Sequence, residues 1–327
     1  MQSQEFAPAC WSLGLRTAGL SLADVRAEFD RGAFLRTHIL RPTWHFVAPA
    51  DLRWMLTVTA PRVHRLNAGY CRREGLDQAT LDRGASVIMD ALRGGAPLTR
   101  PELTAALAAE GIVVAGLALA CLVMHAELEA LICSGPMRGT QPTYALFDGR
   151  VPHSAPGTLA DLVLRFFAGH GPASVKDFCR WSSLTVAQAN AGLGEVADRL
   201  VCVEVEGSTL WSDPAAPTDG DFAAALLLPL YDEATLSYPV INFPTAPDHP
   251  LAPVSLSLGS VILDGTNVAT WHRRVQGRRL IMRVDPVPGL APGLAAGQRA
   301  AVEAAAEQLA VFLGLGLDLQ WGREPIG

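Results

Sequence analysis

The sequence has few of the features that are typical of secreted proteins, of membrane proteins or of proteins stabilised by a structural metal ion. Its six cysteines are scattered, with no C-x-x-C pair and no His/Cys group at zinc-finger spacing. We therefore expect reduced, buried thiols rather than a disulfide framework or a structural metal site. The start of the chain lacks the basic segment of a signal peptide, and no apolar run is long enough to span a bilayer. These absences predict a cytoplasmic protein with no membrane partner.

Lysine is rare in this sequence. Lys176 is the only lysine, and the other basic residues counted as charged are arginines. The net charge of -6 argues against the broad basic footprint of a typical nucleic-acid-binding protein. The arginines nevertheless bunch in two groups, one that includes Arg62 and Arg65 and one that includes Arg273 and Arg274. Since a guanidinium binds phosphate well, a local basic face is one interpretation, and an arginine-rich composition with solvated side chains is the other.

The stretch from 158 to 212 is typical of a winged helix. Three helices are predicted. The first, from about Thr158, has apolar residues at helical spacing, and the second and third begin with capping boxes at Ser174 and Thr185. An alternating segment then turns at Gly207-Ser208, which predicts a two-stranded hairpin. The order is therefore helix, helix, helix and hairpin, the order of elements in a winged helix.

Two earlier stretches follow a similar plan. One has a predicted helix from Gln78 to Arg93, a capping box at Thr99 and an apolar helix at 115–131. The other has a helix beginning at Ser21 and a hairpin with Arg41-Pro42 near its turn, but no helix before them that completes the unit. A repeat of about 60 to 80 residues is thus predicted.

The character of the chain changes after residue 213. A β-meander is predicted at 254–284, with turns at Asp264-Gly265 and Gly277, and a terminal helix at 298–313. We expect an α+β fold that is mainly helical, since the length allows several modest domains. The predicted domains are a first winged-helix unit at 1–70, N-terminally truncated, a second at 71–152, a third at 153–213, and an α+β domain at 214–327.

Several segments resemble one known family. They are LRTHILRPTWHFVAPADLRWML, LICSGPMRGTQPTYALFDGRVP, ASVKDFCRWSSLTVAQA, LLLPLYDEATLSY and VILDGTNVATWHRR. Together they are similar to the winged-helix DNA-binding-domain proteins of the AlkZ/YcaQ-like DNA glycosylase superfamily. The resemblance covers essentially the whole chain, and it implies tandem winged helices in a C-shaped body with a DNA-sized channel.

The resemblance also implies an activity and a catalytic pair. Characterised members excise alkylated purines, some from interstrand crosslinks, without a metal or an organic cofactor, and they use a Gln-x-Gln or Gln-x-Asp motif. Gln2 and Gln4 stand where that motif is expected. Relatives carry about one more helix before the glutamines and an apolar residue at the position of Ser3, so we expect a truncated chain or a misassigned start codon. The alternative for the glutamines is a disordered polar tail.

Glutamine chemistry is suited to this substrate class. The side chains of Gln2 and Gln4 converge only if the segment is extended or enters a helix, because residues i and i+2 diverge on a helix. A neutral amide is no general base, but its oxygen can direct a water and stabilise a developing oxocarbenium ion. An alkylated purine is already cationic and leaves without a general acid. Weak groups therefore suffice for damaged bases and not for normal ones.

Other candidate residues lie on the predicted hairpin and after LLLPLY. Arg41, Thr43, His45 and His38 could contact DNA phosphate or the lesion, with Arg41 favoured over His38, or they could form an ordinary exposed wing with His45 packed. Asp232 and Glu233 are expected to be structural, holding an arginine or capping a helix near Ala234, rather than to act as an acid pair. His125 and Glu129, four apart on an apolar helix, suit a core contact better than a metal site.

Three hypotheses stay open at this point. The first is a monomeric glycosylase that hydrolyses the N-glycosidic bond of alkylated purines in double-stranded DNA, with no metal or cofactor; crosslinks would extend its range. The second is a non-enzymatic winged-helix protein that regulates or senses DNA structure. The third is an interaction scaffold that has lost DNA binding, which the acidic pI of about 5.8 would fit. Candidate DNA contacts are Arg41, Thr43, His45, His38, Arg62, Arg65, Arg273 and Arg274.

Overall fold

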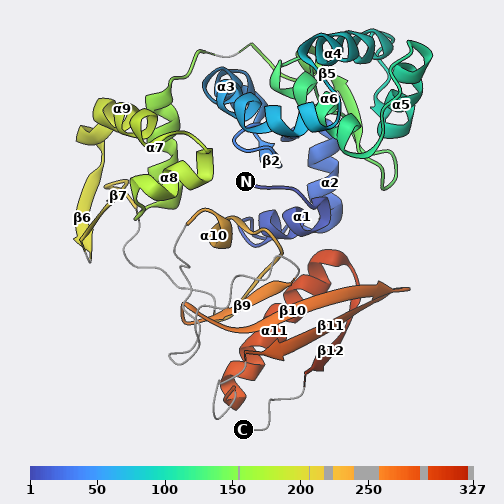
Figure 1. The fold of residues 1–327 in the computed structure, drawn as a ribbon. Helices are drawn as coiled ribbons and strands as arrows, with labels where there is room; N and C mark the ends of the chain where they lie inside the picture. Colours follow the sequence, from blue (N-terminus) through green and yellow to red (C-terminus); the bar gives the residue numbers. More distant parts are fainter. Residues whose placement is uncertain (154, 206, 217–223, 239–257, 288–293, 323–327) are drawn as a thin grey trace. The chain divides into compact units, whose positions relative to one another are not determined.

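A computed structural model describes the chain except for residues 154, 206, 217–223, 239–257, 288–293 and 323–327. The chain divides into two compact units, one made of 1–26 and 217–327 and the other of 27–216 (Figure 1). The first unit thus joins the two ends of the chain. The four-part division predicted from the sequence stays a prediction. Part of the expected meander, residues 254–257, lies outside the described residues.

The first unit is built on a five-stranded sheet with the order β12-β11-β10-β9-β8. Neighbouring strands are antiparallel except β11 and β12, which are parallel. The strands are β8 (Leu226–Leu228), β9 (Gly259–Leu263), β10 (Thr266–Gln276), β11 (Arg279–Pro286) and β12 (Gly316–Trp321). The long helix α11 (Ala296–Leu313) connects β11 to β12 and packs against the sheet (Figure 1).

The hairpin turns of this sheet form where the sequence predicts them. Asp264 and Gly265 both have positive φ, at 45° and 72°, and so does Gly277, at 58°. Positive φ at both central residues of a two-residue turn matches the twist of the flanking strands. The predicted meander and terminal helix are therefore confirmed for the described residues, whereas β12 was not among the predicted elements.

Two tryptophan side chains hold β8 in place. The Trp11 indole N–H donates to the Leu227 carbonyl at 2.8 Å, and that of Trp271 donates to the Leu228 carbonyl at 3.0 Å. Trp271 reaches β8 by crossing Gly259, where a Cβ would lie 2.3 Å from the ring. Only a glycine permits this crossing.

Helix α1 (Phe6–Gly14) carries Trp11 and packs on α11. The rings of Trp11 and Phe312 lie 5.1 Å apart, and a Cβ on Gly14 would be 2.7 Å from Phe312. The short helix α10 (Glu233–Leu236) follows β8. The start of the chain is thus packed into the first unit and is no loose tail.

The second unit begins within α2 (Leu22–Arg31), whose predicted N-terminal Ser21–Asp24 contacts are present. The hairpin of β1 (Leu35–His38) and β2 (Trp44–Val47) pairs His38 with Trp44 and Thr37 with His45. It leads into α3 (Pro49–Arg73), a helix of 25 residues that the sequence patterns did not single out. The hairpin, with Arg41-Pro42 in its connection, is confirmed.

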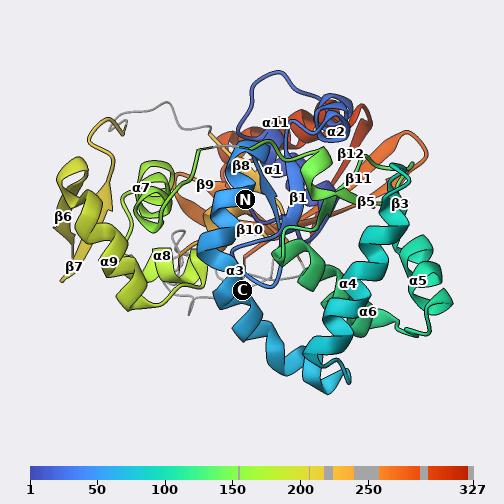
Figure 2. The same ribbon diagram turned by 90° about the horizontal axis from the view of Figure 1, so that it is seen from above.

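Next come two groups of elements that follow similar plans (Figure 2). The first contains α4 (Gln78–Leu92), β3 (Leu98–Thr99), α5 (Arg100–Ala109), α6 (Gly116–Leu128), β4 (Ile132–Ser134), β5 (Thr143–Leu146) and η1 (Phe147–Gly149). The second contains α7 (Leu159–His170), α8 (Val175–Ser182), α9 (Val186–Val196), η2 (Ala197–Arg199), β6 (Val201–Val205) and β7 (Ser208–Ser212). The capping boxes predicted at Thr99, Ser174 and Thr185 are all formed, and Thr158 forms one that was not predicted.

The apolar helix α6 supplies much of the core of the first group. Its residue Leu122 is fully buried in one cluster with Ile88, Leu103 and Leu107. Its length of 13 residues is too short for a bilayer, and throughout the described part of the chain no helix combines the length and apolarity needed to cross a membrane.

Candidate active site

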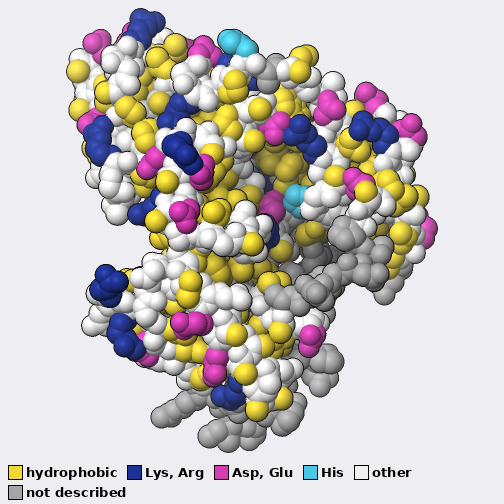
Figure 3. Space-filling model, turned by 180° about the vertical axis from the view of Figure 1, so that it is seen from behind, with side chains coloured by type: hydrophobic (Ala, Val, Ile, Leu, Met, Phe, Trp, Pro, Cys, Tyr) yellow, Lys and Arg dark blue, Asp and Glu magenta, His cyan; other side chains and the backbone are white. Residues whose placement is uncertain are grey.

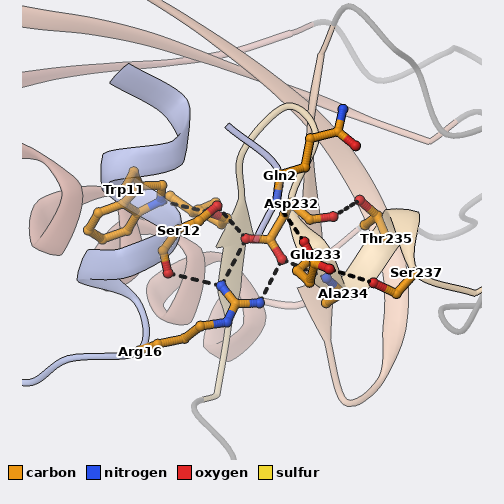
Figure 4. Close-up of polar contacts among 10 residues, drawn as sticks. Gln2, Trp11, Ser12, Arg16, Asp232, Glu233, Ala234, Thr235 and Ser237 are labelled. Atoms are coloured by element: carbon orange, nitrogen blue, oxygen red, sulfur yellow. Dashed lines mark hydrogen bonds and ion pairs between the residues drawn. The ribbon is translucent and has the colours of Figure 1, made fainter. Parts of the chain in front are cut away.

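The glutamine segment is held in the first unit by a buried glutamate. The backbone N–H of Gln2 donates to Glu233 Oε2 at 2.8 Å, and the Ser237 hydroxyl donates to Glu233 Oε1 at 3.0 Å (Figure 4). Gln2 is 8% exposed and Gln4 is half-buried. The segment precedes α1 and is not helical, which is the condition under which side chains at i and i+2 can share a side.

The Gln2 side chain points away from the Glu233 carboxylate that holds its backbone (Figure 4). Glu233 therefore engages the main chain and leaves the amide group to face elsewhere. This arrangement suits a group that must be fixed in position but remain able to bind water or a sugar.

Asp232 is the centre of a second, adjoining set of contacts. Its side chain is fully buried and accepts from Ser12 Oγ at 2.6 Å, from Arg16 at 2.8 and 2.9 Å, and from the Ala234 N–H at 2.9 Å (Figure 4). The expectation that the acidic pair holds an arginine and caps a helix near Ala234 is confirmed. The two-pronged guanidinium contact adds directional specificity to the ion pair.

The pKa of Arg16 reflects both its partial burial and its contact with Asp232. Burial lowers the pKa of Arg16, but the hydrogen bond and charge of Asp232 outweigh it and leave the pKa raised. Arg16 therefore stays charged, as a buried Asp232 carboxylate requires. Sequence reasoning missed Ser12 and Arg16. The available signal was that Ser12, on α1, lies four residues before Arg16, which is in the turn just after that helix.

The hairpin residues lie in the second unit, and most of them are engaged internally. His38 is buried, and its Nδ1 contacts the buried carboxylate of Glu127 on α6. Its ring lies 4.4 Å from that of Trp44, measured between centroids. Glu127 as the partner of His38 was not foreseen, because the two residues are far apart in the sequence.

His45 is fully buried and takes one defined tautomer. Its Nδ1 lies 2.9 Å from the Thr43 carbonyl and its Nε2 lies 3.3 Å from Arg41 Nη2. A carbonyl can only accept and a guanidinium can only donate, so the proton sits on Nδ1. Arg41 is therefore oriented by His45. The Thr43 hydroxyl is buried and has no hydrogen-bond partner among the described residues.

The other predicted arginines differ in their surroundings. Arg62 donates from Nε to the Ser183 carbonyl at 3.0 Å, and Arg65 is exposed. Arg274 is exposed and bonds Gln276, whereas Arg273 is half-buried and lines a cavity of about 160 Å³ beside Trp11 and Trp271. Burial lowers the pKa of Arg273.

The predicted site residues divide between the two units. Gln2, Gln4, Arg273 and Arg274 belong to the first, and the hairpin residues with Arg62 and Arg65 belong to the second. On the face shown in Figure 3, basic and acidic side chains are interspersed, so that face offers local rather than broad positive charge.

Comparison with known proteins gives a consistent result. A curated relative from Streptomyces sahachiroi, named interstrand DNA cross-link repair glycosylase, is 27% identical over 223 residues. The alignment spans 63% of this chain but only 59% of that relative. The solved structure of the Streptomyces sahachiroi DNA glycosylase AlkZ matches with a TM-score of 0.73 over 98% of this chain and 90% of that one, at 22% identity. This structural match shows a shared mixed α and β fold.

The family model covers almost the whole chain, including both glutamines. It is described as DNA glycosylase AlkZ-like and matches residues 1–312, so the chain belongs to the AlkZ-like DNA glycosylase family.

Proposed function

We propose that this protein is a monofunctional DNA glycosylase that hydrolyses the N-glycosidic bond of alkylated, cationic purines in double-stranded DNA. The observation that carries the proposal is the fixed glutamine segment. Gln2 is tied through its backbone to Glu233 in a chain whose family model includes both glutamines. Because the relative's name refers to interstrand crosslinks, we extend the proposed substrates to crosslinked DNA.

In the proposed reaction, the amide oxygens of Gln2 and Gln4 hold a water molecule against the anomeric carbon. The C–N bond breaks as the sugar gains positive charge, and the base departs with the bonding electron pair, which neutralises its own positive charge. Water then adds to the sugar carbon and releases a proton to solvent. The amide dipoles stabilise the oxocarbenium-like transition state without a metal ion or an acid.

The DNA backbone would be held by arginines and by the hairpin. Arg41 is oriented by His45, and Thr43 lies two residues further along the same hairpin connection. Arg273 has no carboxylate partner among the described residues, and its burial favours an anionic ligand. We therefore propose Arg41, Thr43 and Arg273 as phosphate contacts, supported by Arg62, Arg65 and Arg274. His38 and His45 would act by positioning the hairpin.

The arrangement of the helix-and-hairpin groups and the oligomeric state are also part of what we propose. We infer that the three helix-and-hairpin groups are tandem winged helices that together bind duplex DNA in a C-shaped body. The order α7, α8, α9, β6, β7 supports this for the third group. We further propose a monomer, with a first winged-helix unit at 1–70, a second at 71–152, a third at 153–213 and an α+β domain at 214–327. The cytoplasmic location stays a prediction.

The decisive experiment measures base release from duplex DNA containing 7-methylguanine. The double variant Gln2→Ala/Gln4→Ala should lose release while its affinity for the same duplex stays nearly unchanged. Gln308→Ala, which removes an exposed glutamine on α11, is the matched control and should behave as the wild type. If the wild-type chain binds DNA but releases no base, the non-enzymatic DNA-binding protein becomes the better description.

A further inference from the structure

The second unit contains a cluster of potential metal ligands that the proposed hydrolysis does not use. His125 and Glu129 lie four residues apart at the end of α6, and His64 of α3 faces them. One donor atom from each lies within 4.8 Å of the others. Sequence reasoning placed His125 and Glu129 on one face but could not foresee His64, because 60 intervening residues separate it from His125.

The contact between His64 and Glu129 is short. His64 Nε2 lies 2.8 Å from Glu129 Oε1. A nitrogen and a carboxylate oxygen at this distance repel each other unless a proton or a cation lies between them. Tetrahedral ligands about 2.0 Å from zinc are separated from one another by about 3.3 Å, so the observed spacing needs only a small adjustment.

His125 is supported from its other side. Its Nε2 lies 3.0 Å from Asp82 Oδ1 on α4, and Asp82 also accepts from Gln78 at 2.8 Å. When Nε2–H donates to a carboxylate, the lone pair is on Nδ1, where a metal can take it. Carboxylate support of this kind orients metal-binding histidines and strengthens them as ligands.

The site is accessible from solvent through a cavity. A cavity of about 520 Å³ borders His64, His125 and Glu129, with Arg65 and Arg72 also in its lining. The Glu129 side chain is 50% exposed and that of His64 is 32% exposed.

We propose that His64, His125 and Glu129 bind one divalent transition-metal ion, zinc being the first choice, with its remaining coordination position open to this cavity. Two imidazoles and one carboxylate form a ligand set that zinc and ferrous iron both accept. The ion links α3 to α6, and the open position takes water or a small anion near Arg65. It has no part in the proposed chemistry of the glutamines.

The first test is a titration of the tag-free, metal-stripped full chain with Zn²⁺ by calorimetry, and with Co²⁺ by visible absorption. We expect one equivalent of Zn²⁺ to bind with micromolar or tighter affinity, and Co²⁺ to give the intense visible bands of a low-symmetry site. Zn²⁺ should also raise the thermal unfolding midpoint, because the ion binds the folded state. Absence of stoichiometric binding of both ions would overturn the proposal.

The second test assigns the ligands with matched controls. His64→Ala and Glu129→Gln should abolish the binding, whereas His153→Ala and Glu110→Gln should not. Glu110 is a suitable control because it ends α5 at the position that Glu129 occupies on α6, and it is exposed. Zn²⁺ binding that survives both His64→Ala and Glu129→Gln would place the ion elsewhere and refute the assignment.

The third test does not depend on changing a buried residue. Asp82 is 61% exposed, so Asp82→Asn should fold normally. We expect it to weaken Zn²⁺ binding by about 10- to 100-fold, since it removes the carboxylate that supports His125. Unchanged affinity in this variant would contradict the coordination through His125.

Discussion

Glu233 holds Gln2 by its main chain, accepting the Gln2 N–H at 2.8 Å, while the Gln2 side chain points away from it. The contact spans 231 residues of sequence and joins the start of the chain to the residue that begins α10. A neutral catalytic group acts only through its position, so the residue that fixes that position should matter as much as the group itself.

Glu233→Ala should therefore lower base release by about 10- to 100-fold, the penalty typical of a small misplacement of catalytic groups. DNA affinity should change little, because Glu233 contacts the protein's own backbone. Single-turnover release from duplex DNA with 7-methylguanine, beside a binding titration, measures both. Glu233→Gln keeps an acceptor oxygen and should restore much of the rate. Equal rates in wild type and Glu233→Ala would show that this contact does not position the glutamine.

Arg16→Ala should destabilise the fold by about 1–3 kcal/mol, because it leaves the fully buried Asp232 with fewer partners for its charge. Urea denaturation monitored by tryptophan fluorescence gives the free energy of unfolding. Arg31→Ala removes a surface arginine whose side chain is 70% exposed, and it should cost only about 0–1 kcal/mol. A similar loss in both variants would mean that the Asp232 contact contributes no more than a surface ion pair.

Glu102 should make stability depend on pH in the acidic range. Hydrogen bonds from the Thr99 N–H and hydroxyl, and then from Arg138, lower its pKa from 4.5 to about 2. A depressed folded-state pKa gives stability that is present above the unfolded pKa and is lost as the pH falls from about 4.5 towards about 2. Glu102→Gln keeps the capping box but removes the titration, so its urea midpoint should fall less over this range. Parallel pH profiles in the two proteins would contradict this.

Arg41→Ala and Arg273→Ala should each weaken DNA binding about equally for all sequences and reduce the slope of log affinity against log salt by about 1. Fluorescence anisotropy with a labelled duplex at several salt concentrations gives the slope. Arg93→Ala is the control, because the exposed Arg93 is paired with Asp90 in the same helical turn. A slope unchanged by either candidate variant would remove that arginine from the proposed phosphate contacts.

Local chemistry made much of the fold predictable. Ser and Thr three residues before Asp, Glu or Gln marked the starts of α5, α8 and α9, because the reciprocal cap is made within four residues. Asp264-Gly265 likewise marked a turn by its tolerance of positive φ. These signals do not depend on distant parts of the chain.

The elements that escaped prediction depend on tertiary packing. α3 has Pro61 in its interior and an unremarkable pattern, yet it is the longest helix described. β12 pairs in parallel with β11, and α11 lies between these two strands in the sequence, so the pairing is not local. In the site, the family resemblance pointed to Gln2 and Gln4, and a structural role for the DE pair was foreseen. Arg16, Ser12 and the Glu127 partner of His38 depend on approaches that no spacing in the sequence encodes.

The indole of Trp11 has a consequence beyond the site. Among the described strands, β8 is the last of its sheet, and the outermost strand of any sheet can recruit a foreign strand through its open main-chain groups. The Trp11 indole N–H donates to the Leu227 carbonyl of β8, so that this acceptor is already used within the chain. Helix α1, which follows the glutamines, thus hinders self-association along the open edge of β8. Loss of the Trp11 indole should therefore appear first as aggregation on storage.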